Sequence, residues 1–252
     1  MNNTHLAFLL TTLAGFSTLL GTILIFFKFK NKNKIIANSL SFAAGVMITV
    51  SVLDLVPESI KLLRPTSTPF WTITLSFLFI IIGIVISSLI DYYLPSNSYN
   101  NDNLYKVGII SMLAIIIHNI PEGIATFIAT NSNVFLGFSL ALAIALHNIP
   151  EGISISVPIY YATGNKKKAL LYTLISALSE PIGAILAYLF LSKFINNTIL
   201  GLLFSLIAGI MLQISFCELL PSSKKYNINT TFFFILGVLI MIFNLILNYL
   251  II

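Results

Sequence analysis

The sequence predicts an all-α membrane protein of eight transmembrane helices, and composition and hydropathy predict it together. Of its 252 residues, 58% are hydrophobic and only 8% are charged, whereas soluble domains carry about 25% charged residues. The apolar runs reach the roughly 20 residues that span a bilayer, and they lack the alternation of barrel strands. Eight such runs use nearly the whole chain, so we expect a single transmembrane domain over residues 1–252.

The apolar runs follow one another with short polar connections. The first run has no basic start and no small-residue cleavage site, and it is long enough to span. We therefore interpret it as a transmembrane helix and not as a signal peptide. The predicted spans cover residues 5–27, 35–63, 68–94, 105–131, 133–160, 168–193, 196–222 and 229–252.

The net charge of +5 indicates membrane topology and not binding to nucleic acid. Of the thirteen Lys and Arg residues, only Lys61, Arg64 and Lys193 lie in connections on one side. Because basic residues concentrate in cytoplasmic loops, we expect both termini outside, with the other ten in the cytoplasm. Those ten are Lys28, Lys30, Lys32, Lys34, Lys106, Lys166, Lys167, Lys168, Lys224 and Lys225.

One hexapeptide, His-Asn-Ile-Pro-Glu-Gly, occurs twice, in the middle of the fourth and fifth spans. On a helix, His118 and Glu122 are four positions apart and share a face, with Asn119 nearly on the same face. The second copy repeats this arrangement with His147, Asn148 and Glu151. An imidazole, an amide oxygen and a carboxylate on one face make half of a divalent-metal site. Two copies therefore predict a complete site.

A second internal repeat relates the second span to the seventh. Ala-Gly-Val-Met from residue 44 matches Ala-Gly-Ile-Met from residue 208, and Asp54 matches Glu218 at the same offset of 164. The two spans run in opposite directions, as the fourth and fifth do. We therefore expect inverted repeats, spans 1–3 with 6–8 and span 4 with 5, which are typical of transporters with a substrate site near the midplane.

Six of the eight acidic residues fall within spans. Each charge at the bilayer centre costs roughly 2.5–3.5 kcal/mol on insertion scales, so this number favours a hydrated or cation-binding cavity. Glu180 in the sixth span offers a further carboxylate at mid-depth. Asp54 and Glu58 are candidates for an outer funnel, although a pair at the membrane interface explains Glu58 equally well. Spans 1, 3 and 8 otherwise read as lipid-facing scaffold.

The doubled motif, in an eight-span chain with both termini outside, resembles the ZIP family of divalent-metal transporters, and within it the bacterial zinc-uptake (ZupT-like) branch. The resemblance covers essentially the whole chain. It implies uptake into the cytoplasm and a two-metal site at mid-membrane, with the metal as substrate. One ion would take His118, Glu122, His147 and Glu151, and the second Asn119, Glu122, Asn148, Glu151 and Glu180.

The seventh span departs from the family pattern. Related proteins usually show His-Glu-Leu-Leu-Pro, where this chain has Cys217 followed by Glu218. Glu218 reads as an exit ligand toward the cytoplasm. Cys217 is either a soft thiolate ligand or an inert packed cysteine.

These residues predict a transporter of divalent cations in the cytoplasmic membrane, with divalent metal ions and the lipid bilayer as partners. Imidazole and carboxylate ligands favour zinc and also accept iron, manganese, cobalt and cadmium. The alternative is a membrane-embedded metal-dependent hydrolase, which would use the same ligands with an open coordination position. The inverted repeats favour transport, so we expect no enzyme. A homodimer is as compatible with the sequence as a monomer.

Overall fold

The computed structural model describes residues 3–93, 102–191 and 196–251, and these residues form helices and short connections without any strand. The predicted span ends at 94, 193 and 252 lie outside the described residues. The α-helices are α1 (Asn3–Ser17), α2 (Lys32–Val50), α3 (Val56–Leu63), α4 (Pro69–Tyr93), α5 (Asp102–Ser132), α6 (Val134–Thr163), α7 (Lys166–Ala177), α8 (Ser179–Leu186), α9 (Asn197–Ile214), α10 (Leu220–Lys224) and α11 (Thr231–Ile251).

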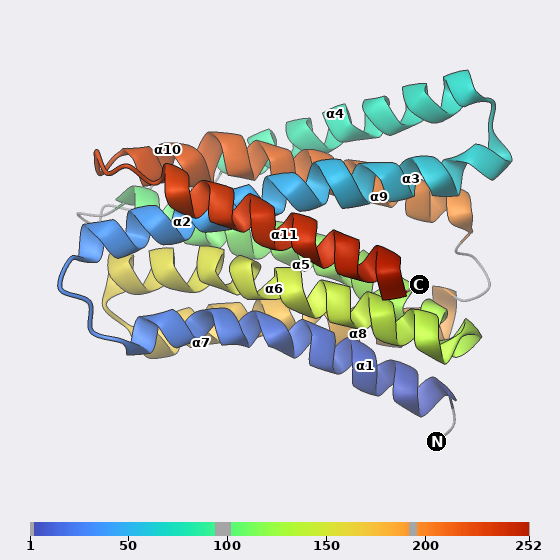
Figure 1. The fold of residues 1–252 in the computed structure, drawn as a ribbon, viewed down its shortest axis with the longest axis horizontal. Helices are drawn as coiled ribbons and strands as arrows, with labels where there is room; N and C mark the ends of the chain where they lie inside the picture. Colours follow the sequence, from blue (N-terminus) through green and yellow to red (C-terminus); the bar gives the residue numbers. More distant parts are fainter. Residues whose placement is uncertain (1–2, 94–101, 192–195, 252) are drawn as a thin grey trace.

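Short segments of other helix types continue several of these helices. They are the 3₁₀ segments η1 (Thr18–Phe26) and η3 (Arg64–Thr66) and the π segments η2 (Ser51–Leu55), η4 (Ala187–Leu191) and η5 (Ser215–Leu219). In this way α1 with η1, α2 with η2 and α3, α7 with α8, and α9 with η5 and α10 each form one long rod (Figure 1).

The all-α membrane architecture is confirmed. Seven of the rods in the described part of the chain are long and apolar enough to cross a membrane. The eighth, α11, has 21 residues, or about 30 Å at 1.5 Å per residue, which matches the hydrocarbon thickness. An even number of crossings returns the chain to its starting side, and Figure 1 shows both termini at the same end of the bundle.

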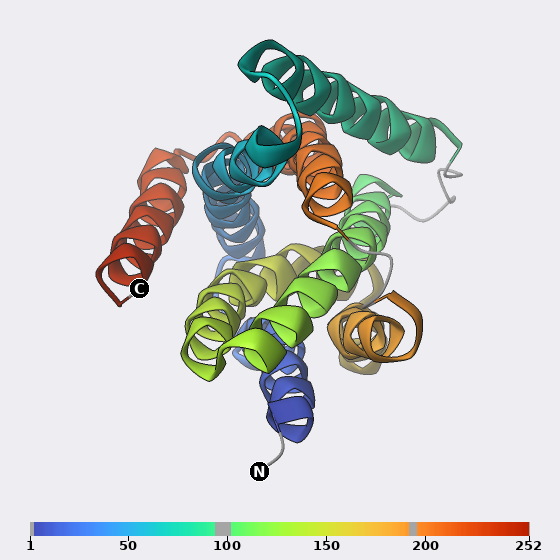
Figure 2. The same cartoon turned by 90° about the vertical axis from the view of Figure 1, so that its right-hand side faces the viewer.

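Two helices occupy the middle of the bundle and the others surround them. Figure 2, a view along the rods, shows α5 and α6 crossing near the centre, with α1 and α8 on one side and α2 and α9 on the other. The outer helices α4 and α11 pack mainly against α9 and α2, respectively. The doubled hexapeptide therefore lies on the two central helices.

The π segments η2 and η5 fall at matching positions of the second internal repeat. They carry its acidic residues, Asp54 and Glu218. Each is followed by a proline, Pro57 or Pro221. Because proline has no N–H to donate to residue i−4, the turn before it is free to adopt the wider i→i+5 pattern, which often marks functional sites.

The first span is not lipid-facing scaffold, and the sequence-based expectation for it is wrong. Gly15 packs against α8, where a Cβ would meet Glu180 Cβ at 3.0 Å. Gly21 lies against the backbone of α6 beside Gly152. Small residues let helix backbones approach closely in a membrane, so this span contacts the helices of the doubled motif directly. In contrast, α4 is largely exposed, as expected of a lipid-facing helix.

Candidate metal centre

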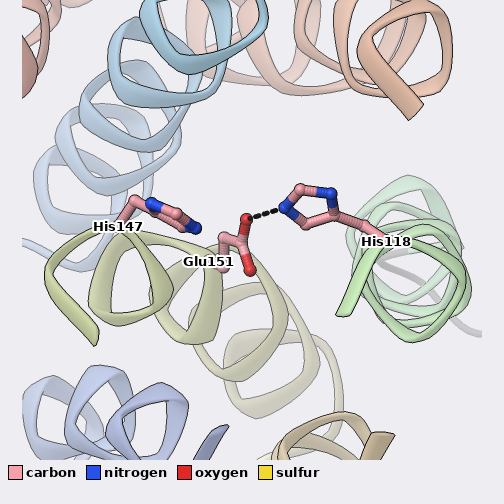
Figure 3. A group of neighbouring side chains, drawn as sticks. All are labelled: His118, His147 and Glu151. Carbon is pink, nitrogen blue, oxygen red and sulfur yellow. Dashed lines mark ion pairs between the residues drawn. The ribbon is translucent and has the colours of Figure 1, made fainter. Parts of the chain in front are cut away.

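The two copies of the hexapeptide face each other in the centre of the bundle. Pro121 and Pro150 lie inside α5 and α6, and neither interrupts its helix. The four-residue spacing places each histidine one turn from its glutamate on the same face. Figure 3 shows His118 reaching from α5 toward His147 and Glu151 on α6.

The imidazoles and carboxylates converge within ligand distance. Nε2 of His118 lies 3.0 Å from Oε1 of Glu122 and 3.5 Å from Oε1 of Glu151, the latter drawn as the dashed line in Figure 3. Nε2 of His147 lies 3.2 Å from Oε1 of Glu122. In a tetrahedral zinc site with bonds of about 2.0–2.1 Å, neighbouring donors are about 3.3 Å apart. The observed separations match the edge lengths of such a coordination shell.

Within the described part of the chain, one group of three His, Cys, Asp or Glu residues could hold a metal ion. It consists of His118, His147 and Glu151, whose ligand atoms all lie within 4.8 Å of one another. Glu122 adds a fourth donor because it contacts both histidines. The cluster thus joins both helices through four side chains.

These side chains are buried, and several of their polar atoms have no hydrogen-bond partner among the described residues. Both carboxylate oxygens of Glu151 and both amide atoms of Asn119 are in this state, as is Nδ1 of each histidine. A buried unsatisfied polar group costs about 1–3 kcal/mol, and more when it is charged. A bound cation and its water would offset that cost.

A second polar group adjoins the cluster. The amide nitrogen of Asn148 donates to the carbonyl oxygen of Ala14 at 2.9 Å and to a carboxylate oxygen of Glu180. Asn148 and Glu180 are both fully buried, and the other Glu180 oxygen has no hydrogen-bond partner among the described residues. Glu180 on α8 therefore lies beside the doubled motif.

The glycines that end the hexapeptides fix the distance between helices. A Cβ at Gly123 would come within 2.9 Å of the Cα of Glu180, and one at Gly152 within 2.9 Å of the carbonyl carbon of Thr18. Real Cβ atoms do not approach so closely. Glycine at these positions lets α8 and η1 pack directly against the two central helices, and thereby brings Glu180 to the site.

The predicted outer funnel residues lie on the second rod, and Asp54 lies within electrostatic range of His147 and Glu122 in the central cluster. Glu58 is exposed at its surface and forms an ion pair with Lys61 at 3.1 Å. That geometry matches the interface pair considered from the sequence. Asp54, one turn before Glu58 along the rod, is half-buried in η2.

The two predicted exit residues, Cys217 and Glu218, differ in how far their side chains are exposed. Cys217 is exposed, so it is not packed in the core. Glu218 is half-buried and lies beside Asp91 at the end of α4. Among the described residues, no hydrogen bond joins Cys217 to Glu218.

Comparison with known proteins gives the family. A family model described as ZIP Zinc transporter matches residues 94–245. The chain belongs to the ZIP family. Its curated relatives include proteins that are named zinc transporter ZupT. They come from Clostridium perfringens (43% identical, covering 90% of each chain), Campylobacter jejuni (40%, 88% of each) and Oceanobacillus iheyensis (39%, 90% of this chain and 91% of the relative).

The sequence did not identify the part of this ZIP protein's first span that reaches the site. Ala14 contributes a backbone carbonyl, which no side-chain motif reveals. The small residues Ala14, Gly15 and Gly21 were the available signal, since small residues mark close helix contacts in membranes. The bacterial relatives and the seven long apolar helices among the described residues identify this ZIP protein as a multi-pass protein of the cell membrane.

Proposed function

We propose that this protein carries divalent metal ions, with zinc favoured, across the cytoplasmic membrane into the cytoplasm. The observation that carries the proposal is the buried group of His118, Glu122, His147 and Glu151, with donor atoms at the edge lengths of a metal coordination shell. The names of the relatives support zinc as the first substrate. The proposed unit is a single transmembrane transporter domain, residues 1–252, and its association into a homodimer stays a prediction.

A second ion would bind next to the first. Asn119, Asn148 and Glu180 supply oxygen ligands on the other side of Glu122 and Glu151, which would bridge the two ions. The orphaned amide of Asn119 and the free oxygens of Glu151 and Glu180 support this arrangement. Oxygen ligands accept harder cations than imidazole does, so we expect iron, manganese, cobalt and cadmium as further substrates.

The path runs past the two π segments. A hydrated cation would enter near Asp54, exchange water for protein ligands between α5 and α6, and leave near Glu218. Each side chain is half-buried on its own segment. With the lysine-rich end in the cytoplasm, the membrane potential adds about 2.3 kcal/mol per charge per 100 mV, and therefore about twice that for a divalent ion moving inward.

A metal-dependent hydrolase would use the same ligands. The relatives are named as transporters and none of those cited is named as an enzyme, which favours transport. We therefore expect purified protein to move metal without hydrolysing lipid or peptide.

The test is zinc flux into liposomes loaded with a zinc-responsive dye. Wild type is compared with His118→Ala/His147→Ala and with His5→Ala, a matched control on an exposed histidine near the N-terminus. We expect flux in the wild type and the control and at least a hundredfold loss in the double variant. Absence of flux for zinc, iron, manganese and cadmium in folded wild type would refute transport.

A further inference from the structure

Three charged side chains from three different spans meet near the end of the bundle opposite the termini. Lys106 lies in the first turns of α5, Asp91 in the last turn of α4 and Glu218 in η5. Nζ of Lys106 is 2.6 Å from Oδ1 of Asp91, with the two side chains 26% and 31% exposed. The Glu218 carboxylate lies next to Asp91 and within the field of Lys106.

Two adjacent carboxylates without a counter-ion form a strong site for a divalent cation. Carboxylate oxygens suit every metal considered above, and a second negative charge a few ångströms away raises affinity steeply where water is scarce. An ion leaving past Glu218 would be held by such a pair. The ammonium of Lys106 cancels one of the two charges.

We propose that Lys106 is a built-in counter-ion at the exit, which occupies Asp91 so that a departing metal meets one net negative charge and is released. The role of this group at an exit rests on the proposed function, whereas the charge compensation itself does not. Lys106 acts through Asp91 and Glu218, so it is a positioning residue and not a ligand.

The contact is suited to this role because it is close but adjustable. Oδ1 of Asp91 makes the ion pair without an aligned hydrogen bond. Lysine carries a compact point charge on a flexible four-carbon stem, so its ammonium can move with the carboxylates as an ion passes. The competing role is a static tie between the third and fourth spans, which predicts lost stability and unchanged metal binding when Lys106 is neutralised.

The experiment measures binding of cadmium to purified protein by equilibrium dialysis. All variants carry His118→Ala/His147→Ala, which takes both imidazoles from the central site, and cadmium affinities are compared within that background. In that background we compare Lys106, Lys106→Gln and Lys106→Met, the last of which keeps an apolar stem of similar length. Lys225→Gln is the matched control, an exposed lysine predicted to lie at the same end of the bundle.

We expect each neutral variant at residue 106 to gain one cadmium equivalent bound at least tenfold more tightly than the background, or about 1.4 kcal/mol. Adding Asp91→Asn should remove the gain, and Lys225→Gln should show none. The inference is overturned if neither neutral variant gains affinity, or if the gain survives Asp91→Asn. Dialysis measures no transport, so its outcome is independent of the liposome assay. Zinc flux in liposomes without the gain in cadmium affinity refutes only the role of Lys106, and the gain without flux refutes only the proposed function.

Discussion

Gly123→Ala tests whether close helix packing builds the metal centre. Gly123 lies on α5 directly against the backbone of Glu180 on α8. An added Cβ would lie 2.8 Å from the carbonyl carbon of Glu180 and 2.9 Å from its Cα, whereas ordinary contact begins at 3.4 Å. The carbonyl oxygen is closer still, so we expect α8 to recede by about 1 Å to restore van der Waals contact.

The structure sets the size of both effects. Overpacking of this kind costs about 1–3 kcal/mol of stability. Metal–ligand distances tolerate deviations of only about 0.2 Å, so a shift of about 1 Å takes Glu180 out of coordination range. Loss of such support typically reduces metal affinity by 10–100-fold. We therefore expect Gly123→Ala to lose stability and at least tenfold in zinc affinity.

Gly209→Ala separates the two effects. Gly209 on α9 faces Ile80 on α4, and its Cβ would lie 2.9 Å from the carbonyl carbon of Ile80 and 3.0 Å from its Cα. The overlap matches that at Gly123 but involves none of the proposed ligands. Thermal unfolding in detergent and zinc affinity by competition with a chelator are measured for both variants. Equal loss of zinc affinity in both, or wild-type affinity in Gly123→Ala, would refute the reasoning.

Three further predictions concern the site and its surroundings. Glu151→Ala should reduce zinc uptake at least a hundredfold without lowering the thermal midpoint, because both oxygens of this buried carboxylate lack a hydrogen-bond partner among the described residues; a large drop in midpoint would indicate a structural role. Zinc affinity should fall as the pH falls, by up to a hundredfold per pH unit, because two imidazoles take up protons that compete with the metal; a pH-independent affinity would contradict histidine ligation. Glu58→Gln should change uptake less than twofold at physiological salt, since an exposed pair with Lys61 contributes about 0–1 kcal/mol; a tenfold loss would place Glu58 in the path.

Hydropathy predicted the spans because length and apolar content are what the bilayer selects. The predicted fifth span, 133–160, corresponds to Val134–Thr163, and the predicted seventh, 196–222, to Asn197–Lys224. The change of helix type within spans was not predicted. Apolar periodicity is too coarse to distinguish i→i+5 from i→i+4 hydrogen bonds over five residues, although Pro57 and Pro221 identify where the ladder is interrupted.

The doubled motif predicted that its side chains meet, because residues four apart on a helix share a face and the two copies lie on neighbouring spans. The sequence could not reveal the contacts that the backbone makes with the cluster. The carbonyl of Ala14 receives a hydrogen bond from Asn148, and such a group is chemically the same at every position. Cys217 was ambiguous for another reason: neighbouring residues in a π turn point in different directions, so Glu218 lies inward while Cys217 is exposed.

The glycine contacts also explain why one side of the centre carries more charge. Gly123 packs on the backbone of Glu180, and Gly152 packs in the same way on the backbone of Thr18. Thr18 therefore occupies on η1 the place that Glu180 occupies on α8. Asn148 meets the Glu180 carboxylate, whereas the corresponding Asn119 has no hydrogen-bond partner among the described residues.

A second carboxylate at the place of Thr18 would add a negative charge to an already acidic buried cluster, and repulsion in a low-dielectric interior is costly. The difference between Thr18 and Glu180 thus lets the two copies of the motif share one asymmetric centre. Glu180 makes one side of it richer in oxygen ligands, and this is the side on which we place the second ion.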